Sequence, residues 1–95
     1  MPEIRFRIRW PDGRAETCYS PSLVVKEFFA VGASYPLGDF LKRTRTALDI
    51  ASERVKERYG WRCSRASAQL ACIETAAKNF ASVSDARVSV EAFEE

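Results

Sequence analysis

The sequence contains no histidine among its 95 residues. Histidine is the usual general base of Ser–His and Cys–His catalysis and the commonest ligand of transition metals, so its absence excludes those sites. Glycine is also scarce, and Gly32, Gly38 and Gly60 form no phosphate-binding loop motif. Glu53 and Glu57 share a helix face, but they lie among basic residues, and nothing in the pattern indicates the cleft that acid–base chemistry needs. The sequence therefore presents no catalytic set.

The three cysteines, Cys18, Cys63 and Cys72, are odd in number and form no C-x-x-C pair. This pattern is typical of free thiols in a reducing compartment, and it predicts neither a metal site nor a cofactor. Cys63 precedes a predicted helix and has Arg62 and Arg65 nearby, an environment that makes thiols reactive. Cys63 is thus a candidate reactive thiol, although a half-buried small residue in a turn between helices is the favoured interpretation.

No apolar run approaches the roughly 20 residues that a membrane span needs, and the N-terminal stretch MPEIRFR has no apolar segment of signal-peptide type. The chain begins with Met1, as expected of a complete protein, and its length predicts one domain, residues 1–95. Hydrophobic residues make up 46% of the chain, which is enough for a core that needs no disulfide or metal. We expect a cytoplasmic protein without membrane association.

Positive charge is concentrated in the middle of the chain. The formal net charge is +2, but residues 39–65 hold eight basic and four acidic residues, while residues 66–95 hold two basic and five acidic ones. The mixed signs include the i,i+4 pair Arg45 and Asp49, which is typical of a helix face with salt bridges in solvent. This segment is a weak candidate for binding nucleic acid, and the solvated face is favoured.

The stretch IRFRIRW predicts a strand over residues 3–10, because Ile4, Phe6, Ile8 and Trp10 alternate with Arg5, Arg7 and Arg9. The following WPDGR favours a type I turn with a G1 bulge at Gly13, so residues 14–19 return as the second strand of a hairpin. The expected register sets Cys18 opposite Phe6 on the inner face. On the outer face it sets Thr17 opposite Arg7 and Tyr19 opposite Arg5.

The remaining elements follow from periodicity and caps. A short helix is predicted over residues 23–29 after Ser20 or Ser22, although this run is apolar enough to be a strand. Apolar residues spaced by three and four predict a helix from about Pro36 to Tyr59, and Tyr59 is the last residue of its apolar stripe. Gly60 is suited to the position just after the end of this helix. A second helix is predicted from a Ser64 cap to about Phe80, and alternation over residues 86–92 predicts a last strand.

These elements predict an α+β fold with two layers, ββ(α)ααβ. A three-stranded sheet of order 2-1-3 is formed by the hairpin and the C-terminal strand. Two long antiparallel helices and the short helix cover one of its faces. The C-terminal strand is expected beside the first strand and parallel to it, because two long helices would return the chain to the start of that strand.

The arginine row on the outer sheet face is the main candidate site. Arg5, Arg7 and Arg9 with Thr17 and Tyr19 form a mixed guanidinium and aromatic surface of the type found at protein interfaces. The same residue types bind phosphate and nucleic acid, but the modest net charge argues against nucleic acid. A solvated face, with the arginines paired to Glu16 or Glu91, is the alternative without a binding function.

Several strings together resemble a family of small bacterial nitrogen-starvation response proteins: RWPDG, CYSPSLVVKEFF, SYPLGDFLKRTRTALDIASERVKERYGWRCSRASAQL and VSVEAF. The resemblance covers nearly the whole chain. It implies a bacterial, cytosolic role linked to nitrogen, and a gene cluster that also encodes a nitrilase. It assigns no catalytic or binding residue.

We therefore expect a non-catalytic accessory or protein-binding component of a nitrogen-starvation or nitrile-related pathway, with a protein partner or self-association. A small enzyme or a ligand-binding protein of the same pathway is one alternative. A regulator that binds nucleic acid is another.

Overall fold

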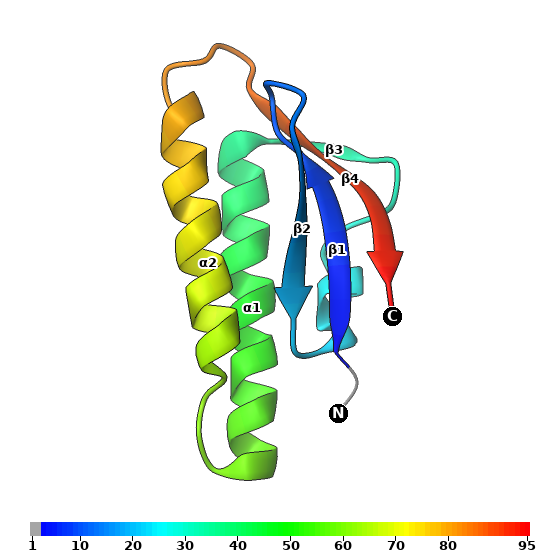
Figure 1. The fold of residues 1–95 in the computed structure, drawn as a ribbon, viewed down its shortest axis with the longest axis vertical. Coiled ribbons are helices and arrows are strands. Elements are labelled where there is room, and N and C mark those ends of the chain that lie inside the picture. The colour runs from blue at the N-terminus through cyan, green and yellow to red at the C-terminus, as the bar shows by residue number, and fades with distance from the viewer. Residues whose placement is uncertain (1–2) are drawn as a thin grey trace.

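A computed structural model of the chain describes residues 3–95, so residues 1 and 2 of the expected domain lie outside the described part. The two long helices pack side by side against one face of a four-stranded sheet (Figure 1), which agrees with the expected α+β class. The elements in chain order are β1 (Ile4–Arg9), β2 (Ala15–Ser20), the 3-10 helix η1 (Leu23–Glu27), β3 (Ser34–Pro36), α1 (Leu37–Tyr59), α2 (Ser64–Ala77), the 3-10 helix η2 (Lys78–Phe80) and β4 (Arg87–Glu94).

The β1–β2 hairpin confirms the predicted register. Phe6 lies opposite Cys18, Arg7 opposite Thr17 and Arg5 opposite Tyr19. The turn closes through two bonds, from the Trp10 amide to the Arg14 carbonyl at 2.8 Å and from the Gly13 amide to the Trp10 carbonyl at 2.9 Å. Gly13 has φ of +91°, a conformation that glycine adopts without strain, so the predicted bulge is present.

The run after β2 is the short helix η1, which resolves the helix-or-strand ambiguity at residues 23–29. The Ser22 hydroxyl accepts a hydrogen bond from the Val24 amide at 3.3 Å, as expected for a helix N-cap. Val24 and Val25 are buried against the rest of the core.

The helix boundaries agree closely with the predictions. Gly60 caps α1 in the left-handed conformation, with φ of +89°, and its amide donates to the Lys56 carbonyl at 2.8 Å. The N-cap of α2 is Cys63, one residue before the predicted Ser64, and the Cys63 side chain makes no capping hydrogen bond. Arg45 pairs with Glu74 of α2 at 2.8 Å and not with the predicted Asp49, because α2 packs beside α1 and brings a carboxylate closer.

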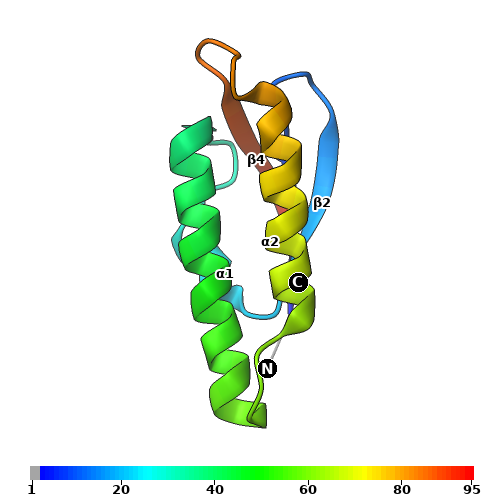
Figure 2. The ribbon, with the colours of Figure 1, turned by 90° about the vertical axis from the view of Figure 1, so that its left-hand side faces the viewer.

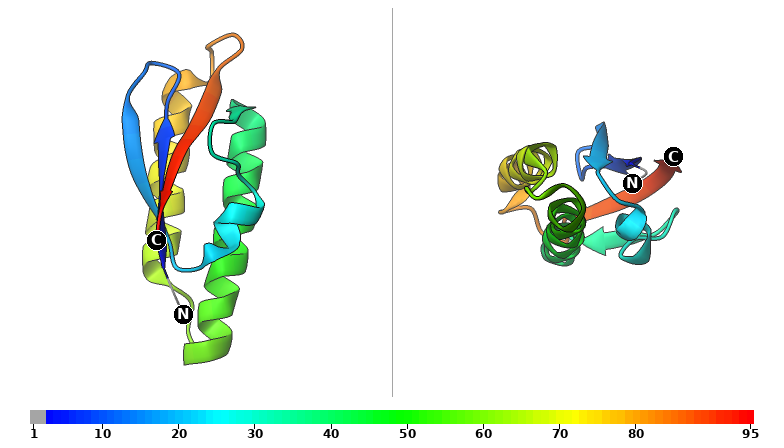
Figure 3. Two further views of the ribbon diagram at one scale, coloured as in Figure 1. Left: turned by 90° about the vertical axis from the view of Figure 1, so that its right-hand side faces the viewer. Right: turned by 90° about the horizontal axis from the view of Figure 1, so that it is seen from below.

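The prediction of three strands was wrong, because β3 adds a fourth in the order β2-β1-β4-β3. The prediction of a parallel C-terminal strand was also wrong, since β4 is antiparallel to β1. The cause is the segment 28–36, which carries the chain along β4 to the opposite end of the molecule before α1 begins (Figures 1 and 3). There the Gly32 amide donates to the Val90 carbonyl at 2.8 Å, and the Val90 amide donates to the Ala33 carbonyl at 3.0 Å.

The core lies between the sheet and the helices. Phe6, Ile8 and Phe40 are fully buried, and the Trp10 ring stacks on Phe80 with centroids 5.7 Å apart. Tyr59 is the exception to the predicted α1 stripe, because it is 47% exposed. The last turns of α1 extend past the end of the sheet (Figures 1 and 2), so the stripe has no partner there. No helix within residues 3–95 is long and apolar enough to cross a membrane.

Replacing Phe6 with Ala should lower the free energy of unfolding by about 3–5 kcal/mol, because the change leaves a cavity in a closed core. The matched control is Thr17→Ala on the exposed side of the hairpin, where we expect a change within about 0.5 kcal/mol. Chemical denaturation followed by circular dichroism measures both values. A Phe6→Ala midpoint near that of the wild type would mean that the faces of β1 are assigned wrongly.

Candidate functional site

The outer face of the sheet is not covered by a helix: viewed from that side, the strands lie in front of α2 (Figure 3, left). Arg5, Arg7, Arg9 and Thr17 are all exposed there, as predicted. Tyr19 is only partly exposed, because its ring is covered by the Arg65 guanidinium of α2, 3.9 Å from the ring centre. The structure therefore keeps four of the five predicted contact residues on one open face and turns the fifth toward a helix.

A bulge in β4 determines how the arginine row is paired. Arg7 lies opposite Ala92 but Ile8 lies opposite Val90, so Glu91 is an extra residue in the ladder. Its carboxylate lies 2.8 Å from Arg9 Nε and 3.4 Å from Arg7 Nε. The hydrogen bond from Arg9 holds the pKa of Glu91 below its usual range and raises the pKa of Arg9. Glu91 consequently stays ionised well below neutral pH and neutralises part of the row.

Arg5 is the arginine of the row that does not pair with Glu91. No carboxylate among residues 3–95 lies within ion-pair distance of its guanidinium, although Glu94 is its cross-strand neighbour. The positive charge available to a partner on this face is therefore greatest at the Arg5 end.

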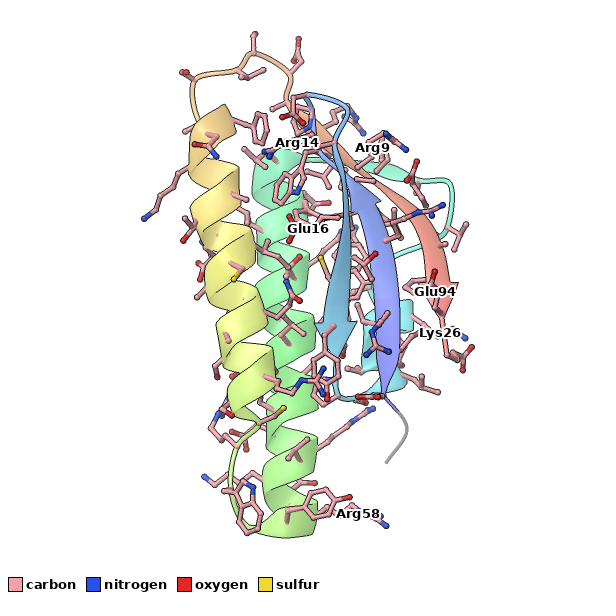
Figure 4. All side chains as sticks on the ribbon, viewed as in Figure 1. Arg9, Arg14, Glu16, Lys26, Arg58 and Glu94 are labelled. Carbon is pink, nitrogen blue, oxygen red and sulfur yellow. The ribbon has the colours of Figure 1, made fainter. Side chains whose placement is uncertain are left out.

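The turn between α1 and α2 holds a second candidate surface, which the sequence patterns did not reveal. Trp61 is 70% exposed, and its ring lies 6.5 Å from that of Tyr59, which is also largely exposed. Arg58 lies over the Tyr59 ring at 5.8 Å (Figure 4). We call Arg58, Tyr59 and Trp61 the hairpin tip. The sequence signal for this surface is that the apolar stripe of α1 continues past the end of the sheet. This signal can be recognised only when the length of the sheet is known.

The hairpin tip is held in place by Arg62. This side chain donates to Asp49 at 2.7 Å and also bonds to Glu53, so it ties the turn back to α1. The hydrogen bond to Asp49 raises the pKa of Arg62, which keeps the tie charged. The exposure of Trp61 is thus imposed by a fixed turn.

The candidate thiol Cys63 lies at the start of α2 beside this turn and is partly exposed. It contributes to a small hollow of about 240 Å³ together with Glu3, Tyr19, Pro21, Val55 and Tyr59. Arg62 points away from Cys63 to its carboxylate partners, so one of the two predicted cationic neighbours is engaged elsewhere. Cys18 is buried in the core and Cys72 is exposed on α2.

Two further observations concern ligand sites. Within residues 3–95 no three Asp, Glu or Cys side chains lie together in a way that could hold a metal ion. A hollow of about 450 Å³ lies between β2 and α2 and is lined by Arg14, Glu16, Ala71, Cys72, Thr75, Ala76 and Asn79.

Residues 5–93 match the model of a family described as nitrogen starvation-induced protein NitG. No curated protein and no solved structure matches the chain.

The three thiols should react in the order of their exposure. Burial raises the pKa of the Cys18 thiol, and its side chain is closed to solvent, so both effects suppress the reactive thiolate. Under native conditions a maleimide should label Cys72 fastest, Cys63 more slowly and Cys18 only after unfolding. Peptide mass spectrometry of a labelling time course measures the order. Labelling of Cys18 at the native rate of Cys72 would contradict its position in the core.

Proposed function

This chain belongs to the NitG family of nitrogen starvation-induced proteins, and we propose that within this response it is a non-catalytic component that binds another protein. The hairpin tip is the observation that carries the proposal. The proposal also places the protein in the cytoplasm and links it to the nitrilase whose gene cluster the sequence resemblance implies.

The residue types at the tip favour a protein partner. Trp, Tyr and Arg dominate the binding energy of protein interfaces, because they bury large areas around a polar or charged group. Tyr59 at the end of α1 and Trp61 in the turn that follows are exposed and are not part of the core cluster. A large exposed aromatic pair on a fixed turn is typical of an interaction site.

The charge around the tip indicates the kind of partner. Residues 53–65 contain five basic and two acidic residues, and both acidic ones are in α1. Glu53 is already paired with Arg62. The tip should therefore bind an apolar pocket with an acidic rim on the partner.

Replacing Tyr59 and Trp61 together with Ser should weaken partner binding by about tenfold or more, as expected when central aromatic residues are lost. The unfolding free energy should hardly change, because both side chains are exposed. The test is chemical cross-linking in nitrogen-starved cells, followed by binding measurements with the purified captured protein.

The matched control is Val83→Ser, because Val83 is also an exposed apolar residue, 46% accessible, but lies far along the chain in the loop before β4. Equal binding by the wild type, the control and the tip variant would show that the hairpin tip is not the binding site. Binding to random DNA that falls steeply with salt and is lost in the tip variant would instead favour a regulator that binds nucleic acid.

The arginine row is proposed as a second contact, favoured by the uncompensated charge of Arg5. Replacing Arg5 and Arg7 with Ser should change stability by well under ~1 kcal/mol per site, because both are exposed. It should slow association with an acidic partner, and the effect should shrink as salt is added. Stopped-flow association rates measure this, with Lys42→Ser on the exposed side of α1 as the control. Identical rates for all three proteins would leave the row as a solvated face.

A further inference from the structure

The hollow of about 240 Å³ beside the hairpin tip lies where the end of β2, the last turns of α1 and the start of α2 meet. Its walls are mainly apolar and aromatic. Val55 and Tyr59 are four residues apart on α1, so both project from the same side of the helix. Tyr19, Pro21 and Cys63 form other walls. The last part of the apolar stripe of α1 therefore faces a hollow and not the core.

Among residues 3–95, the one carboxylate that lines this hollow is that of Glu3, and it is already paired. Arg65 Nη1 lies 3.7 Å from Glu3 Oε2, and the same guanidinium lies 3.9 Å from the centre of the Tyr19 ring. Arg65 therefore neutralises Glu3 and covers one face of Tyr19. A cationic ligand would find no free carboxylate in the hollow.

Unpaired positive charge surrounds the hollow. Arg54 and Arg58 each precede one of its α1 wall residues by one position, so they run beside the apolar pair along the helix. The Arg58 guanidinium lies 5.8 Å from the centre of the Tyr59 ring. Arg54 Nη1 donates to Ser22 Oγ at 3.1 Å, and Ser22 follows the wall residue Pro21. In the described chain, neither guanidinium lies within ion-pair distance of a carboxylate.

The acidic residues at this end of α1 lie away from the hollow. Glu53 and Glu57 precede its α1 wall residues by two positions, which places them on the opposite side of the helix. Glu53 is paired with Arg62. On the sheet, Arg5 is the cross-strand neighbour of Tyr19 and has no carboxylate partner among residues 3–95. The hollow is therefore apolar at its centre and positively charged around its rim.

Size and charge together indicate the occupant. Pockets for small molecules usually enclose about 300–1,000 Å³, so this smaller hollow suits a single side chain of a larger ligand. Its aromatic walls favour an aromatic side chain, because aromatic rings pack well on one another. Carboxylates on both sides of that side chain would complement the arginines of the rim, Arg5, Arg54 and Arg58.

We propose that an acidic segment of the partner protein binds here, with one aromatic side chain in the hollow and carboxylates against the arginines of the rim. This inference rests on the proposed function, because it names the part of the partner that the protein binds. It also joins the two proposed contacts into one surface. Tyr59 belongs to both the hairpin tip and the hollow, and Arg5 adjoins the hollow at Tyr19.

A designed peptide tests the site without the natural partner. The probe is a blocked heptapeptide with a central phenylalanine and three acidic residues on each side. In an NMR titration it should shift the amide resonances of Tyr19, Val55 and Cys63. Replacing its phenylalanine with serine should raise the dissociation constant by about tenfold or more, and added salt should weaken binding. A peptide with lysine in place of the acidic residues should not bind.

Variants of the protein locate the contact. Val55→Glu places a carboxylate in the hollow and should abolish binding of the acidic peptide. The matched control Val83→Glu, at another exposed valine, should bind as the wild type does. The double variant R54E/R58E should lose the acidic peptide and bind the lysine peptide instead. Thermal unfolding of each variant checks the fold, because Val55 is partly buried.

No binding of the phenylalanine peptide at millimolar concentration, or equal binding of the serine peptide, would overturn the proposal. So would an R54E/R58E variant that still prefers the acidic peptide. The captured partner separates this proposal from the proposed function. If Val55→Glu binds that partner normally while the variant lacking Tyr59 and Trp61 does not, the hollow is excluded and the hairpin tip remains. If both variants bind it normally, both sites are excluded.

Discussion

Complete burial of the inner side of β1 is the constraint on which the other parts of the structure depend. Ile4, Phe6 and Ile8 are at most 1% exposed, and β1 is paired on both sides, with β2 and with β4. Because side chains alternate along a strand, this commits Arg5, Arg7 and Arg9 to the opposite face. The helices cover the apolar side alone, so the arginines remain outside the core. Function must then lie on surfaces that the core does not use.

Three surfaces around the core differ in how their charge is balanced. On the sheet face, the β4 bulge places Glu91 between Arg7 and Arg9, which leaves Arg5 as the uncompensated group. At the hairpin tip, Arg62 is used to hold the turn, while Arg58 lies free beside the aromatic pair. At the β2 edge, Arg14 pairs with Asp12 at 2.7 Å, and Glu16 accepts a hydrogen bond from Trp10 Nε1 at 2.9 Å.

Much of the fold could be predicted from local patterns. The WPDGR turn determined the hairpin register, and Gly60 marked the end of α1, because both depend on a few neighbouring residues. The strand β3 was missed because three residues that include a proline carry no periodic signal. The predicted direction of β4 was wrong because it depends on the end of the sheet at which the segment 28–36 places the start of α1. The path of this segment is set by its hydrogen bonds to Val90.

The candidate sites show the same division. The exposed arginine row was predictable from alternation, but its pairing was not, since a bulge at Glu91 has no signature in the sequence. Tyr59 was assigned to the core because the helical stripe continues through it. Only the relative lengths of α1 and the sheet show that the apolar stripe of α1 extends beyond the end of the sheet. The hairpin tip could therefore not be predicted from periodicity.

Amide hydrogen exchange tests most directly the claim that β1 is the fixed core on which the other parts of the structure depend. The account predicts that the amides of β1 exchange slowest, because β1 is paired on both sides. The amides of Ala15 and Thr17 should exchange much faster, because no residue of the described chain accepts a hydrogen bond from them. Exchange in β1 as fast as at this edge of β2 would contradict the account.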